Sequence, residues 1–269
     1  MIIQILSLLP LAVLAALVGS VPPPIGYARV PVAPDSFGAW LREFPVREGS
    51  PPVYLYDGRL KANQSAHYAV LDIDVGDRDL QQCADAVIRL RAEYLFTLPC
   101  RDEIVFDFTS GDAARWSDWR DGQRVVVSGN EVSWRNAAAP DSSYAGFRRY
   151  LDTVFMYAGS ASLEREILPV NDIRNLRGGD VFIQGGFPGH AVIVVDVAEN
   201  AAGDRVFLLA QSYMPAQDIH ILKSFAEISP WYRVQAVGKL HTPEWGFEFD
   251  DLRRFEGASC EGAVARTDE

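Results

Sequence analysis

The stretch "GDVFIQGGFPGHAVIVVDV", residues 179–197, contains two β-rich runs on either side of a loop rich in glycine and proline. Val, Ile and Phe at this density are typical of strands buried in a core, and Gly and Pro provide the backbone conformations of tight turns. The loop ends at His190, which we expect to be the first residue of the second strand. An imidazole there is either a catalytic base on a rigid scaffold or a side chain that only caps the end of the strand.

Apolar residues at helical spacing predict two main helices elsewhere in the chain. The first follows a stripe that includes Cys83 and runs to about Phe96, with Asp77 or Asp79 as the expected N-cap. The second lies within residues 142–159. The remaining pattern is one of short strands and turns, so the sequence predicts an α+β fold whose sheet is mostly antiparallel.

The first twenty residues, "MIIQILSLLPLAVLAALVGS", contain no charged side chain. We interpret residues 1–20 as a signal peptide and the Pro-rich residues 21–35 as a linker. A single domain is expected over 36–255, with a β- and Trp-rich insertion at about 101–140, and a flexible tail over 256–269. The expected location is periplasmic or secreted, without a transmembrane span in the mature protein. The alternative is an uncleaved membrane anchor, although the apolar run is short for a span.

Composition excludes several classes of function. Of the 269 residues, 48% are hydrophobic and 23% charged, as in ordinary globular proteins, and the net charge of −11 gives no electrostatic footprint for nucleic acid. No phosphate-binding loop, zinc spacing or serine-hydrolase elbow occurs, so no cofactor is expected. The aspartates at positions 72, 74, 77 and 79 do not have the spacing of an EF-hand loop, and no metal site is expected.

The chain has three cysteines, Cys83, Cys100 and Cys260. A helix from Cys83 to Phe96 carries the chain about 20 Å away at ~1.5 Å per residue. The four residues that follow recover only about 13 Å, too little for the ~5.5–6 Å Cα separation of a disulfide. The sequence therefore favours a Cys100–Cys260 bridge, with Cys83 as the odd thiol.

Cys83, His190 and Gln211 have the residue types and chain order of a thiol-hydrolase triad. A helix start favours a thiolate, a histidine can take the thiol proton, and a polar side chain can orient the imidazole. If the strands around residues 191–210 form a hairpin over Ala201-Ala202, His190 lies opposite Tyr213, with Gln211 on the same face. The structural alternative is a buried inert thiol, a histidine that caps a strand and a glutamine that satisfies backbone groups.

Aromatic residues provide candidate substrate contacts: Trp116, Trp119, Phe187 and Tyr213. The tryptophans have an equally good explanation as core residues. His220 alternates with two isoleucines, which predicts that its imidazole faces solvent.

Several phrases resemble an uncharacterised bacterial family catalogued as domain of unknown function 4846. They include "DVGDRDLQQCADAVIRLRAEYL", "FRRYLDTVFMYAG" and "GDVFIQGGFPGHAVIVVDVA", within a region of roughly Val53 to Tyr232. The resemblance implies a secreted or envelope-associated protein and brings no established activity.

A second similarity bears on chemistry. "GDVFI…GHAVIVVDV…VFLLAQ" is similar to the second half of papain-like cell-wall hydrolases of the NlpC/P60 type. The resemblance implies a papain-like core with Cys83 as nucleophile, His190 as base and Gln211 as the orienting residue. The chain differs in having Gln-Cys-Ala-Asp where that type has Asp-Cys-Ser-Gly, and in a Cys-to-His interval of 107 residues.

Two hypotheses follow from these patterns. The first is an exported thiol amidase or peptidase that acts on cell-wall peptides. The second is a non-catalytic module that keeps the fold and binds a cell-wall peptide or another envelope ligand through the GGFPG loop and the tryptophans.

Overall fold

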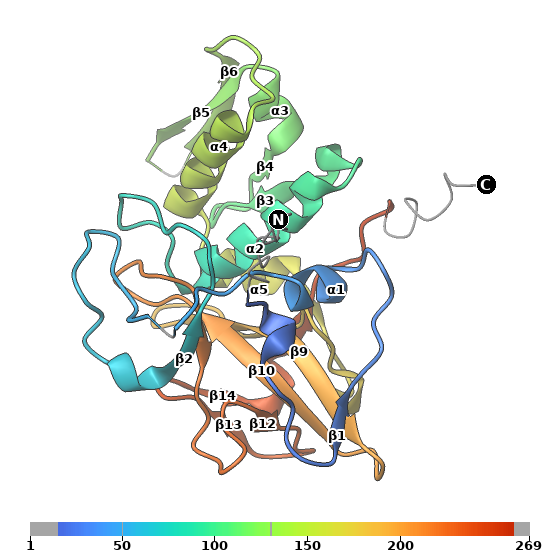
Figure 1. Cartoon of the computed structure of the whole chain (residues 1–269). Coiled ribbons are helices and arrows are strands. Elements are labelled where there is room, and N and C mark those ends of the chain that lie inside the picture. Colours follow the sequence, from blue (N-terminus) through green and yellow to red (C-terminus); the bar gives the residue numbers. More distant parts are fainter. Residues whose placement is uncertain (1–15, 50, 130, 261–269) are drawn as a thin grey trace, which may run out of the picture.

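The computed structural model describes residues 16–49, 51–129 and 131–260, and its centre is a nine-stranded antiparallel sheet (Figure 1). The main path of strands is β2-β11-β10-β9-β8-β15-β7, with β1 paired to β9 and β12 paired to β10. The strands are β1 (Tyr27–Arg29), β2 (His67–Val70), β7 (Leu168–Pro169), β8 (Val181–Gln184), β9 (His190–Asn200), β10 (Arg205–Gln211), β11 (His220–Leu222), β12 (Tyr232–Arg233) and β15 (Leu252–Arg254).

Strands β8 and β9 are the two β-rich runs within residues 179–197. They pair antiparallel with Gln184 opposite His190, so the histidine is the first residue of its strand, as predicted. Strand β9 also pairs with β10, in a register that places Ala210 opposite Ile193. The predicted hairpin is confirmed, and it brings the start of β9 beside the end of β10.

The described residues form five α-helices and five short 3₁₀ helices, and the predicted α+β class is confirmed. As predicted, two of the helices, α2 and α4, are the long ones. The helices are α1 (Phe37–Arg42), α2 (Cys83–Thr97), α3 (Trp116–Arg120), α4 (Tyr144–Tyr157), α5 (Ser160–Glu166), η1 (Val18–Ser20), η2 (Gln64–Ala66), η3 (Arg101–Glu103), η4 (Ile173–Asn175) and η5 (Phe249–Asp251).

The sheet is buried on both faces. Alternate residues of β9, such as Ile193, belong to the apolar cluster that also contains the buried side chains of α2. The intervening residues, such as Val192, belong to a second cluster with Phe182 and Phe247. Phe247 comes from the hairpin of β13 (Lys239–His241) and β14 (Gly246–Glu248). Strand β9 is therefore covered on each side, which explains why its sequence is almost continuously apolar.

Two further hairpins, with α3 and α4, form the upper part of the molecule in Figure 1. One pairs β3 (Val105–Asp107) with β4 (Ala113–Arg115), and the other pairs β5 (Gln123–Ser128) with β6 (Glu131–Asn136). They correspond to the segment of about 101–140 that the sequence analysis treated as an insertion.

The start of the described chain is part of the fold, contrary to the predicted linker. Val18 is fully buried and its N–H donates to the Phe44 carbonyl, while the indole N–H of Trp231 donates to the Pro22 carbonyl. Cleavage after Ser20 would therefore remove a core side chain. Most of the predicted signal peptide, residues 1–15, lies outside the described residues.

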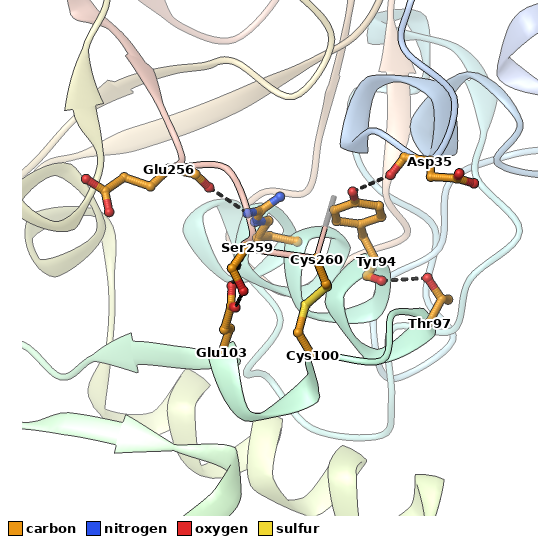
Figure 2. Close-up of a disulfide and its surroundings, with 9 residues drawn as sticks. Asp35, Tyr94, Thr97, Cys100, Glu103, Glu256, Ser259 and Cys260 are labelled. Carbon is orange, nitrogen blue, oxygen red and sulfur yellow. Dashed lines mark hydrogen bonds between the residues drawn. A yellow bond between two sulfur atoms is a disulfide. The ribbon is translucent and has the colours of Figure 1, made fainter. Parts of the chain in front are cut away.

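A disulfide joins Cys100 to Cys260, as the sequence favoured, with the Cα atoms 5.9 Å apart (Figure 2). Around it, the Arg91 Nη2 donates to the Glu256 carbonyl and the Ser259 N–H donates to Glu103. The predicted tail is thus fixed to the fold up to Cys260, and the rest of it lies outside the described residues. No helix in the described part of the chain is long and apolar enough to cross a bilayer.

Candidate functional site

Cys83 is the first residue of α2. Gln82 has an extended backbone and is the N-cap, its N–H donates to the Asp85 carboxylate at 3.1 Å, and its carbonyl accepts the first helical hydrogen bond from Ala86. The N-cap predicted from the sequence was Asp77 or Asp79, which would leave the thiol beyond the first turn. That expectation was wrong, and the thiol instead lies where the partial positive charge of the helix is greatest.

His190 and Gln211 form a direct hydrogen bond, 2.9 Å from the imidazole Nε2 to Gln211 Oε1. Both side chains are about 1% exposed. Aromatic rings fix the imidazole plane: Tyr213 lies 4.9 Å and Trp245 5.2 Å from it, centroid to centroid. The predicted proximity of these two candidate residues is confirmed.

The hydrogen-bond chain continues beyond Gln211. Its Nε2 donates to Glu244 Oε2 at 2.7 Å, and the other oxygen of Glu244 accepts from Lys61 Nζ at 2.5 Å. Because a carboxylate only accepts, Gln211 must turn its NH₂ group toward Glu244 and its carbonyl toward His190. The Gln211 carbonyl can only accept, so the proton of the neutral imidazole is on Nε2. Nδ1 is then the nitrogen with a free lone pair.

Cys83 lies at the same end of β9. The backbone N–H of Ala191, the residue after His190, lies close enough to the thiol to favour its thiolate form, and the thiol is near enough to Tyr213 to influence that phenol electrostatically. The structure therefore brings Cys83 to the end of β9 at which His190, Gln211 and Tyr213 lie, but no hydrogen bond joins the thiol to the imidazole among the described residues. Lys61 and Glu244 complete the cluster, although nothing in the local sequence around either residue indicated such a role.

Burial dominates the electrostatics of the cluster. It raises the pKa of Cys83 to about 11, with a further increase from the Asp85 carboxylate. Burial also lowers the pKa of His190 to about 4, helped by the Lys61 charge and opposed by the Gln211 hydrogen bond. Thiol and imidazole are therefore both neutral at pH 7. A catalytic Cys83 was expected to have a lowered pKa, and the structure gives the opposite direction.

We expect this neutral state to appear in the pH dependence of alkylation. Cys83 is the one cysteine outside the disulfide. Because only the thiolate reacts, the rate of iodoacetamide labelling should rise about tenfold per pH unit from pH 7 to pH 10. Mass spectrometry of the native protein after brief labelling measures the rate. A rate that is already at its plateau below pH 7 would instead indicate a thiolate–imidazolium pair and contradict the expectation.

The candidate substrate contacts divide into two groups. Trp116 and Trp119 are 1% and 6% exposed and pack on Tyr150 of α4, in the core toward the far end of α2 from Cys83. The structure gives them little surface for a ligand. Phe187, in contrast, is 99% exposed in the GGFPG loop, and Tyr213 is partly exposed beside the imidazole.

The GGFPG loop has a tightly constrained form. Gly186 has a positive φ of 127°, and a Cβ on Gly189 would lie 2.3 Å from Ser160 Oγ and 2.6 Å from the Gly186 carbonyl oxygen. The glycine that precedes His190 therefore has no space for a side chain, which fixes where β9 starts.

His220 does not face solvent, contrary to the prediction. It is fully buried, its Nδ1 lies 2.8 Å from the Asp218 carbonyl oxygen, and its ring lies 6.2 Å from that of His67. Strand β11 is an inner strand of the sheet, and its two faces are covered, because Ile221 belongs to one apolar cluster and Leu222 to the other. Among the described residues, no group of three or more His, Cys, Asp or Glu side chains could hold a metal ion.

Comparison with known proteins identifies the family. The family model described as domain of unknown function (4846) matches residues 17–254, and the chain belongs to this family. The match begins within the segment that the sequence analysis treated as a signal peptide, in agreement with the burial of Val18. No curated protein and no solved structure matches the chain.

Proposed function

We propose that the protein is an exported cysteine hydrolase with a papain-like core, a thiol amidase or peptidase that acts on cell-wall peptides. The observation that carries the proposal is the directional hydrogen-bond chain from Lys61 through Glu244 and Gln211 to His190. It assigns the imidazole lone pair to Nδ1, and the residue after His190, Ala191, brings its backbone near the thiol of Cys83 at the start of α2.

In the proposed reaction, His190 Nδ1 takes the proton of the Cys83 thiol as the sulfur attacks the carbonyl carbon of a peptide bond. The backbone N–H groups of Cys83 and Ala84, which face the thiol in the free site, stabilise the oxyanion. The imidazolium returns the proton to the leaving amine, and a thioester remains on Cys83. Water, deprotonated by the same imidazole, hydrolyses the thioester and restores the thiol.

The neutral resting pair is compatible with this scheme. A thiol with a pKa near 11 and an imidazole with a pKa near 4 transfer no proton while the site is free. Binding of substrate changes the surroundings of both groups, and the imidazolium then forms only as the sulfur attacks. The transfer is therefore coupled to the bond-forming step.

Two observations support an envelope substrate and location. The Cys100–Cys260 disulfide is typical of proteins in oxidising compartments. Phe187 and Met214, 99% and 56% exposed, lie in the segments next to His190 and Tyr213 and provide apolar surface for a peptide.

A non-catalytic binding module is the second candidate, and the burial of the site favours it. Cys83 is 9% and His190 1% exposed, so a substrate carbonyl reaches the sulfur only if the surrounding segments open. In this case the exposed Phe187 loop would bind an envelope ligand without turnover.

The deciding experiment incubates the purified chain with peptidoglycan stem peptides and analyses the products by mass spectrometry. Hydrolysis by the native chain and none by the Cys83→Ala variant support the hydrolase. Binding of the peptides by both proteins, with no cleavage by either, supports the binding module.

A further inference from the structure

A cavity lies away from Cys83. It has a volume of about 330 Å³ and lies among the segment after β1, the turn before β8 and the chain after β15. The cavity wall includes Asp196 of β9, which lies about 20 Å along the extended strand from His190. The volume is within the ~300–1,000 Å³ range of small-molecule sites.

The wall of this cavity is rich in arginine. It contains five arginines and three acidic residues, an excess of two positive charges in a chain whose net charge is −11. The charged residues are Arg42, Arg91, Arg177, Arg205, Arg254, Asp180, Asp196 and Glu256.

Two of the acidic residues are beneath the arginines rather than on the surface. The side chain of Asp196 has no exposed area and accepts from two guanidinium groups, Arg29 at 2.7 Å and Arg42 at 2.8 Å. Asp180 is equally buried and accepts from Arg254 at 2.6 Å. Because the side chains of Arg42 and Arg254 are 18% and 25% exposed, guanidinium groups lie over these two carboxylates, and Glu256 is the one exposed acidic residue of the cavity wall.

Several guanidinium donors have no partner within the described part of the chain. Arg42 uses Nε and Nη2, and Arg254 also uses Nε and Nη2, which leaves Nη1 free on each. Arg177 is exposed, and its guanidinium forms no ion pair with any described residue. The existing ion pairs hold the first two side chains in place, so their free donors are already oriented.

We propose that this cavity, which we name the arginine pocket, binds a small molecule through an oxyanion group, phosphate or carboxylate. Arg42, Arg177 and Arg254 would donate to it. Guanidinium groups match the geometry of both anions with paired hydrogen bonds. The proposal is independent of the chemistry at Cys83.

The test measures the binding of pyrophosphate and of citrate to the full chain by isothermal titration calorimetry at low ionic strength. We expect one or both to bind, and Arg177→Gln to raise the Kd at least about tenfold, the effect of losing a charge-assisted hydrogen bond. Arg174→Gln is the matched control, because Arg174 is an exposed arginine three residues away that pairs with Asp172 and does not line the cavity.

Binding of pyrophosphate alone identifies a phosphate ligand, and binding of citrate alone identifies a carboxylate. Binding of both identifies a general oxyanion site. Each result supports the proposal if it depends on Arg177 and not on Arg174. Absence of binding up to about 10 mM of either probe, or equal weakening by the two substitutions, overturns it.

Discussion

Replacement of Glu244 by glutamine is expected to lower kcat/KM for the proposed hydrolysis by about 10³- to 10⁴-fold, while the fold stays intact. Lys61 only donates, so it will hold the carbonyl oxygen of the new amide and turn the NH₂ group toward Gln211. Gln211 must then reverse, so that its own NH₂ group faces His190. The imidazole proton moves to Nδ1, and the base for Cys83 is lost. A wrong tautomer of this kind costs about 10⁴ in a serine-protease triad.

A double variant provides the control for this prediction. Lys61→Met removes the short contact to the Oε1 oxygen of residue 244 and leaves only the longer one from Asn63 Nδ2 at 3.4 Å, so in Lys61→Met/Glu244→Gln the amide at 244 can again accept from Gln211. We expect this variant to recover at least about tenfold of the activity that Glu244→Gln loses. The ¹⁵N shifts of the His190 ring report the tautomer without any activity measurement. An Nε2-protonated ring in Glu244→Gln would show that the relay does not set the tautomer.

Loss of the disulfide is expected to lower the free energy of unfolding by about 4 kcal/mol. The bridge closes a loop with a sequence separation of 160 residues, for which chain entropy alone gives about 5 kcal/mol, against typical measured values of about 2–4 kcal/mol. The Cys100→Ser/Cys260→Ser variant should therefore melt about 10 °C lower. Urea unfolding followed by tryptophan fluorescence measures the change.

Ser259→Ala is the matched control for the disulfide variant. It removes the hydroxyl contact to Glu103 beside the bridge and keeps the bridge itself. Because this contact is exposed, we expect a change below about 1 kcal/mol. If the double serine variant were no less stable than Ser259→Ala, the entropic role of the disulfide would be refuted.

The central sheet could be predicted because the residues that determine it lie close together in the sequence. The β8 and β9 runs are so apolar that they fit only a buried sheet, and the turn between β9 and β10 sets the register that brings Gln211 to His190. The start of α2 could not be predicted in this way. Asp79 has the appearance of an N-cap, but its Oδ1 accepts from the backbone of Ala216, 137 residues further along the chain.

The candidate site likewise contains some residues that a local sequence pattern marks and others that no local pattern marks. Cys83, His190 and Gln211 belong to elements with clear patterns, so their order and spacing suggested a common location. Lys61 and Glu244 are 183 residues apart and come from loops, where no periodicity marks them. His220 was misassigned because alternation indicates a solvent face only when one side of a sheet is open, and this sheet is covered on both.

The burial of Cys83 has a consequence for oxidative folding. Thiol–disulfide exchange requires a thiolate, and an unfolded chain presents Cys83 with a pKa near 8.5. Folding raises that pKa to about 11, which lowers the thiolate fraction at pH 7 by about two orders of magnitude. The native chain thus protects the Cys100–Cys260 bridge from attack by its own third cysteine. Mispairing is a hazard only before α2 has packed on the sheet.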